Sequence, residues 1–146
     1  MKPGRDIYRI IDANFNRSRE GLRVCEDISR FIMNQSAVSR ELKSLRHGVS
    51  AIIRLSPATA KILLESRNAA KDVGRSIRLK TEVERSGYAD IFMASIQRVK
   101  ESLRVLEEFF KLIDIELAVK LSDLRFRTYD IEKKAVKRLT SLSHRR

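Results

Sequence analysis

Apolar residues recur along the first third of the chain with the spacing of amphipathic helices. From Asp6 to about Met33 they are separated alternately by four and three residues, which predicts one long helix with a single buried stripe. A second stripe follows Ser36, whose hydroxyl is expected to cap the next helix. The first stripe contains Ile11, Phe15, Ser18, Leu22, Cys25, Ser29 and Ile32, and the second contains Val38, Leu42, Leu45, Val49 and Ile52. The turn between these helices is short, so they should be antiparallel neighbours.

The rest of the chain repeats this design after an interruption. Ser56-Pro57 is typical of a helix start and predicts a shorter helix ending near Ser66. From Arg67 to Gly87 no apolar period holds, which favours an irregular segment suited to a ligand loop. A long helix is then expected from about Tyr88 to Ile113, and a last one after Asp114. Their stripes are Phe92, Ile96, Val99, Leu103, Leu106, Phe110 and Ile113, then Leu117, Leu121, Leu124, Ile131, Ala135 and Leu139.

These patterns predict an all-α, single-domain bundle of four long helices and one short helix. We expect the domain to span residues 1–146, with a basic C-terminal tail from about residue 140. Phe126, although flanked by cations, is expected to pack in the core. Only five Gly and two Pro in 146 residues leave too little punctuation for many strands.

Composition narrows the class of protein further. The single Cys25 excludes an internal disulfide, and neither a signal peptide nor an apolar segment long enough for a bilayer is present, so we expect a cytoplasmic protein without a membrane partner. Lys and Arg number 31 against 19 Asp and Glu, a formal net charge of +12. The excess indicates an anionic partner: nucleic acid, a phosphorylated metabolite or a membrane surface.

A charged motif, Arg-x-x-Glu-x-Leu-Arg-Val-x-Glu, occurs twice. An offset of 81 residues aligns Ala13–Ile32 with Ala94–Ile113, and charged as well as apolar positions agree. We interpret this as an internal repeat related by pseudo-symmetry. The identical pairs are Ala13/Ala94, Arg17/Arg98, Glu20/Glu101, Leu22/Leu103, Arg23/Arg104, Val24/Val105, Glu26/Glu107 and Ile32/Ile113.

Packing explains the apolar half of the motif, but not the charged half. Residues three apart are helix neighbours, so each copy is expected to form a ladder of alternating charge. Such a ladder is either a solvated surface or one wall of a cleft between the two related helices. A cleft of this kind suits a phosphorylated ligand, because guanidinium groups bind phosphate oxygens and carboxylates bind Mg²⁺.

Markers across nearly the whole chain resemble one enzyme family. They are the segment Arg9–Arg17 running into Glu20-Gly21-Leu22-Arg23-Val24 and Glu26-Asp27, Leu45-Arg46-His47, Arg67, Asp72-Val73-Gly74, Arg98 with Glu101–Glu108, and Leu124–Tyr129. The chain is similar here to the small helical hydroxymethylpyrimidine phosphate kinases of bacterial thiamine biosynthesis, which are often fused to thiamine phosphate synthase. The chain differs from that family at Ser95-Ile96, where a copy closer to Asn14-Phe15 is usual.

The resemblance implies ATP-dependent phosphorylation of 4-amino-5-hydroxymethyl-2-methylpyrimidine phosphate to its diphosphate, with ATP and Mg²⁺ as cofactors. It also implies functional coupling to a thiamine phosphate synthase. Because the acceptor is already a phosphate, no protein nucleophile is needed, and catalysis is mainly positioning and charge neutralisation.

The residue roles come from this chemistry and from the duplicated motif. Catalysis is assigned to Arg23, Arg104, Glu20 and Glu101. Phosphate and substrate binding is assigned to Asn14, Arg17, Arg98, Lys71, Asp72, Gly74, Arg125 and Arg127, with Arg125 or Arg127 closing the site. The metal is assigned to Glu26 and Glu107, with Glu20 and Glu101 as further candidates.

Two other classes of protein fit the sequence less well. A helical nucleic-acid-binding or adaptor protein would explain the net charge, but the acids that alternate with cations in the motif would weaken attraction to a polyanion. A structural partner that uses a face of the bundle is the third hypothesis. The sequence leaves the oligomeric state open, a homo-oligomer included.

Overall fold

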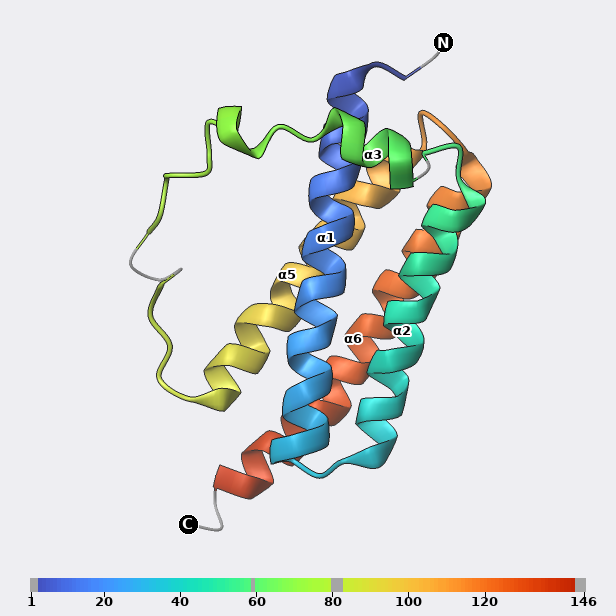
Figure 1. Ribbon diagram of the computed structural model, residues 1–146. Helices are drawn as coiled ribbons and strands as arrows, with labels where there is room; N and C mark the ends of the chain where they lie inside the picture. The colour runs from blue at the N-terminus through green and yellow to red at the C-terminus, as the bar shows by residue number, and fades with distance from the viewer. Residues whose placement is uncertain (1–2, 59, 80–82, 144–146) are drawn as a thin grey trace.

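The predicted helices are all present in the structure. The computed structural model describes the backbone of residues 3–58, 60–79 and 83–143, and within these ranges it is an all-α fold without strands (Figure 1). Four long helices and one short helix lie in this part of the chain, as expected. They are α1 (Arg5–Asp27), α2 (Ser36–Leu55), the short α3 (Ala60–Ser66), α5 (Tyr88–Phe110) and α6 (Ile115–Ser143).

The helices form two antiparallel hairpins that pack on each other (Figure 1). In one hairpin α1 is followed by α2, and in the other α5 is followed by α6. Helix α1 lies against α2, α3 and α5, and α6 lies against α5 and α2, so the two motif-bearing helices are in direct contact. The fully buried side chains of the core come from all four long helices and include Leu22, Leu42, Leu103 and Leu121.

The internal repeat extends to the second helix of each hairpin. An offset of 79 residues aligns α2 with α6 and makes four positions identical: Leu42/Leu121, Leu45/Leu124, Arg46/Arg125 and Ile52/Ile131. The offset falls from 81 to 79 because the turn of the first hairpin is two residues longer. That turn contains a five-residue stretch of π-helix, η1 (Ile28–Ile32). The bundle is therefore two related hairpins that differ at one turn.

Two expectations about the core are wrong. Ile32 is 48% exposed, because the wider turn of η1 rotates the following residues and buries Met33 instead, whose N–H donates to the Ile28 carbonyl at 2.9 Å. Phe126 is 57% exposed, and Thr128, which lies two residues later and points inward, is fully buried in its place. The other apolar stripe positions of α1, α2, α5 and α6 are buried or half-buried.

Three helix boundaries also differ from expectation. Ser36 is the first residue of α2 and caps nothing, since Gln35 occupies the cap position without a side-chain bond. Ser56 and Pro57 lie before α3, and the Ser56 hydroxyl accepts a bond from the Ala58 N–H at 3.1 Å in a local turn. Helix α5 ends at Phe110, followed by a turn at residues 111–113.

The ends of the chain complete the description. Helix α6 runs through Ser143, so the predicted tail begins within a helix, and residues 144–146 lie outside the described part of the chain. No helix among the described residues has both the length and the apolar character needed to cross a bilayer.

Candidate functional site

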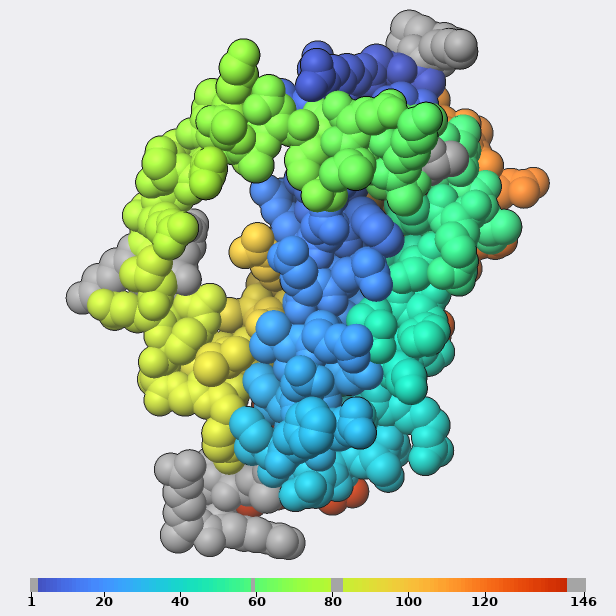
Figure 2. Space-filling view, viewed as in Figure 1, coloured from blue at the N-terminus to red at the C-terminus, as the bar shows by residue number. Residues whose placement is uncertain are grey.

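A cleft of about 460 Å³ lies where α1 and α5 pass under the segment that joins α3 to α5. Figure 2 shows this segment arching away from α1, with an open hollow between the arch and the helices. The cleft gathers five of the residues that the sequence nominated. They are Asn14, Arg17, Arg98, Glu101 and Gly74, and the lining is completed by Ser102, Val105 and Ile77.

The charge inside the cleft is not balanced. Arg17 and Arg98 are equivalent positions of the repeat, and neither forms an ion pair with any residue that the structure describes. Among the described residues, Arg17 donates to the Asn14 amide oxygen alone, at 3.3 Å. Glu101 is the one carboxylate of the described lining, and it accepts a bond from the Gln97 amide at 3.0 Å. Two guanidinium groups without an ion pair on facing helices give the cleft a net positive charge among its described lining residues.

Gly21 explains how the two helices come so close beside the cleft. A Cβ atom on Gly21 would lie 2.7 Å from Cγ2 of Val99 and 2.9 Å from the Ser95 carbonyl oxygen. The backbones of α1 and α5 therefore meet one helical turn from Arg17, which brings the two unpaired arginines into a single site.

The joining segment is anchored to α1 by a buried carboxylate. Arg67 donates from Nε and Nη2 to the two carboxylate oxygens of Asp12, each at 2.8 Å. Asp12 is buried, and its hydrogen bond raises the pKa of Arg67. Further along, the Asp72 carboxylate accepts the Gly74 N–H at 2.9 Å. These bonds hold the start of the segment beside α1, from where Gly74 and Ile77 reach the cleft.

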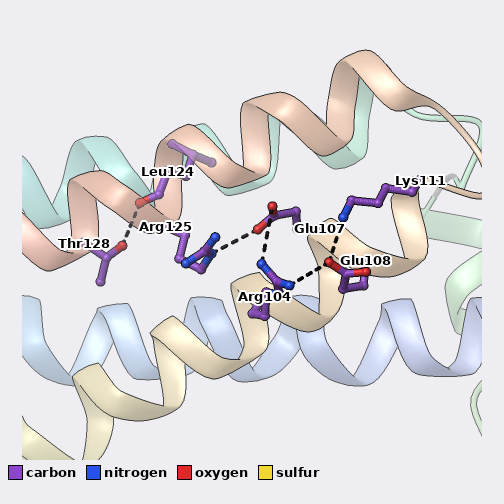
Figure 3. A network of polar contacts seen from close by, with 7 residues as sticks. All are labelled: Arg104, Glu107, Glu108, Lys111, Leu124, Arg125 and Thr128. Atoms are coloured by element: carbon purple, nitrogen blue, oxygen red, sulfur yellow. Dashed lines mark hydrogen bonds and ion pairs between the residues drawn. The ribbon is translucent and has the colours of Figure 1, made fainter.

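The last glutamate of each motif copy has a different role. Glu26 is buried and accepts from Arg46 of α2 at 2.9 Å, and Glu107 is buried and accepts from Arg125 of α6 at 3.0 Å. Figure 3 shows the second of these bridges, with Arg125 reaching from α6 to Glu107 on α5. The bond to Glu107 raises the pKa of Arg125. Each bridge ties the two helices of one hairpin together, which explains why this part of the motif is duplicated.

The second arginine of each motif copy, Arg23 or Arg104, lies beside one of these bridges and does not line the cleft. Arg23 is 3.6 Å from Glu26, and Arg104 is 3.9 Å from Glu107 and 3.1 Å from Glu108 (Figure 3). Only this half of each predicted ladder forms, since no ion pair joins Arg17 to Glu20 or Arg98 to Glu101 among the described residues.

The remaining nominated residues are spread over other surfaces. Glu20 lines a separate groove with Arg23 and Arg46 on another side of α1. Lys71 is exposed in a single turn of 3₁₀-helix, and Asp72 lines a small pocket beside the Asp12–Arg67 pair. Arg127 is exposed and donates to the Ser44 hydroxyl at 3.2 Å. The roles given to these residues and to Arg23, Arg104, Arg125, Glu26 and Glu107 stay predictions.

No group of three or more carboxylate, histidine or cysteine side chains is poised for a metal ion in the described ranges. Magnesium seldom needs such a cage, because one or two carboxylates together with substrate phosphates complete its shell. Glu101, in the cleft beside the two unpaired arginines, fits that requirement.

The comparison with protein families decides where this chain belongs. The model of the ThiD2 family matches residues 9–134, which include the cleft, both buried bridges and the Asp12–Arg67 pair. The chain belongs to the ThiD2 family. The expected link to thiamine biosynthesis is thereby confirmed, and the kinase activity stays a prediction.

Relatives with curated names are longer proteins. Thiamine-phosphate synthase of Rhodopirellula baltica is 34% identical over 125 residues, which cover 86% of this chain and 33% of that protein. Thiamine-phosphate synthases of Synechocystis sp. and Thermosynechococcus vestitus are each 37% identical, over 86% and 88% of this chain and 35% of theirs. This chain thus spans about a third of the curated relatives that it matches. No solved structure matches it.

Proposed function

We propose that this domain is the kinase of thiamine biosynthesis that converts 4-amino-5-hydroxymethyl-2-methylpyrimidine phosphate into its diphosphate at the expense of ATP. Membership of the ThiD2 family and the thiamine-phosphate synthases among its relatives support the pathway. The single observation that carries the choice of reaction is the unpaired pair, Arg17 and Arg98, in the α1–α5 cleft.

The repeat relationship of the two arginines suits transfer between two phosphates. In this reaction an oxygen of the acceptor phosphate attacks the γ-phosphorus of ATP, and the bond to the β-γ bridging oxygen breaks. The attacking and leaving groups are then both phosphate oxygens on opposite sides of one phosphorus atom. Equivalent cations on two pseudo-symmetric helices can neutralise both sides, so a phosphate acceptor fits this cleft better than an alcohol.

The other cleft residues complete the assignment. We assign hydrogen bonds with the acceptor to Asn14 and Ser102, and the approach of the nucleotide phosphates to the backbone around Gly74. Glu101 would hold Mg²⁺, which when bound supplies charge neutralisation on the phosphates. In this assignment the phosphate-binding role lies with Arg17 and Arg98 ahead of Arg23 and Arg104, which have carboxylate partners.

Coupling to a thiamine phosphate synthase is part of the same proposal. The relatives named thiamine-phosphate synthase carry a region like this one within a chain about three times as long. A diphosphate gives the pyrimidine a pyrophosphate leaving group, which activates it for a later substitution. We expect a cytoplasmic enzyme whose product is consumed by such a synthase.

An assay of ADP release tests the proposed function. The protein with Mg²⁺ and ATP should release ADP when the pyrimidine monophosphate is added and much less with the unphosphorylated alcohol. ³¹P NMR of the product should show the paired signals of a diphosphate. ADP release with the alcohol alone, or none with either compound, would overturn the proposal and return attention to the nucleic-acid-binding or adaptor hypothesis.

A further inference from the structure

A second cleft, of about 510 Å³, lies beside the turn that joins α1 to α2. Its walls are the end of α1 with the adjoining η1 on one side and the first two turns of α2 on the other. Three cations line it, Arg30, Arg40 and Lys43, together with the amide of Asn34 and the hydroxyls of Ser36 and Ser39. None of these residues belongs to the α1–α5 cleft.

The lining offers hydrogen-bond donors without a matching acid. Arg30, Arg40 and Lys43 form no ion pair with any residue in the described ranges. Glu26 is the one carboxylate of the described lining, and it is already bound by Arg46 at 2.9 Å with Arg23 at 3.6 Å. The cleft therefore keeps the charge of three cations for a ligand, as the α1–α5 cleft keeps that of two arginines.

The internal repeat allows the residues that line the second cleft to be compared with their equivalents in the second hairpin. At the 79-residue offset the core positions of α2 and α6 stay alike, but the residues that line the second cleft differ in kind. Ser36, Ser39, Arg40 and Lys43 correspond to Ile115, Ala118, Val119 and Ser122. Ile115 and Val119 are exposed, so packing does not explain the difference at these two positions, whereas Ala118 is buried. Arg40 and Lys43 are therefore specific to the first hairpin, whose turn is also the one widened by η1, whereas Arg30 has a cationic counterpart in Lys111.

We propose that this cleft is a second oxyanion site, which binds a phosphate or diphosphate group through Arg30, Arg40 and Lys43. Guanidinium and ammonium groups around one pocket, with hydroxyl and amide donors between them, match the oxygens of such a group. The site is separate from the α1–α5 cleft, and the proposal does not depend on the kinase activity.

Titration of the full chain with inorganic pyrophosphate, followed by ¹H–¹⁵N NMR, tests the proposal. The backbone amides of Ser36, Ser39 and Arg40 should shift and saturate. The double variant Arg40→Val/Lys43→Ser introduces the residues of the second hairpin at exposed positions, and it should bind pyrophosphate at this turn roughly tenfold more weakly, about 1.4 kcal/mol. A matched control, Lys133→Val/Lys137→Ser on the exposed face of α6, removes the same charge and should leave the affinity unchanged.

A third variant separates the two clefts. Arg17→Gln/Arg98→Gln should keep the pyrophosphate-induced shifts of the amides at the turn. This result is expected whether or not the α1–α5 cleft takes part in catalysis. Shifts confined to the α1–α5 cleft, or equal losses in the turn variant and its control, would overturn the proposal. So would shifts of the turn amides with a single-stranded oligonucleotide but not with pyrophosphate, since the site would then be a nucleic-acid contact.

Discussion

Arg67 and Asp12 are 55 residues apart in the chain, yet they form a bidentate pair with both bonds at 2.8 Å. The carboxylate lies buried on α1, while the guanidinium is 46% exposed and stands at the start of the segment that covers the α1–α5 cleft. The pair is a strong link between that segment and α1, because charge-assisted bidentate bonds exceed single neutral ones.

Asp12→Asn should loosen the covering segment while the bundle stays folded. The amide keeps the size of the side chain but provides one acceptor oxygen in place of two, and no charge. Hydrogen exchange should accelerate in residues 69–79 and stay slow in α2 and α6. If the segment carries part of the nucleotide site, KM for ATP should rise more than kcat falls. Unchanged exchange in the segment would contradict the anchoring role.

Breaking a buried bridge should cost far more stability than removing an exposed arginine. Arg46→Ala removes both hydrogen bonds of the buried Glu26 carboxylate and leaves it with the half-exposed Arg23 at 3.6 Å, so the expected loss is about 3 kcal/mol, the low end for a broken buried pair. Arg104→Ala removes pairs in which the guanidinium side chain is 56% exposed, so the loss should stay below about 1 kcal/mol. Urea unfolding at neutral pH measures both variants. Similar losses for the two would show that the bridges do not stabilise the hairpins.

Gly21→Ala should destabilise the contact between α1 and α5. A methyl group there meets a backbone carbonyl oxygen at 2.9 Å, which cannot move aside cheaply, and overpacking of this kind costs about 1–3 kcal/mol. Gly48→Ala is the matched control, because its new methyl group meets only the end of the Leu124 side chain at 3.0 Å and gains helix propensity. Thermal unfolding should rank the Gly21 variant clearly below the Gly48 variant.

The Cys25 thiol should be inert in the native protein. Burial raises its pKa well above the ordinary value of 9.0. Since the folded state favours the neutral thiol, this contribution to stability is complete below pH 9 and declines at higher pH, where the unfolded thiol ionises. Iodoacetamide at pH 8 should modify Cys25 only after denaturant is added. Rapid labelling of the native protein would contradict the buried position.

Helix periodicity was enough to predict the fold, and its failures have local causes. The stripes of α2 and α6 needed only apolar residues at intervals of three and four, and both are buried as predicted. The prediction that Ile32 is buried was wrong because a π-helical turn adds a residue that the pattern does not reveal. Ser36 failed because a residue suited to a cap also fits the first helical position.

The site was predictable in part, since the motif identified the right helices but not the right faces. The four charged residues of a motif copy are spaced by three, which is less than one helical turn, so each points further around the helix than the one before. From the first to the last they are nine residues apart, roughly two and a half turns. Arg17 and Glu26 therefore point to opposite sides of α1, one to the cleft and one to Arg46. The three-residue spacing could therefore have predicted from the sequence that the two ends of the motif face different neighbours. The contact of Asp12 with Arg67 had no signal, because an irregular segment fixes its position only through tertiary bonds.

The central claim is that the unpaired arginines of the α1–α5 cleft bind the phosphates between which the group is transferred. The most direct measurement compares ADP release by Arg17→Gln and Arg98→Gln with that by Arg23→Gln and Arg104→Gln, using the pyrimidine monophosphate as acceptor. We predict that Arg17→Gln and Arg98→Gln each lower kcat on the order of 100-fold. Arg23→Gln and Arg104→Gln should each keep a kcat near that of the unmodified protein. Full turnover in both Arg17→Gln and Arg98→Gln, with a loss of turnover in Arg23→Gln and Arg104→Gln, would contradict the claim.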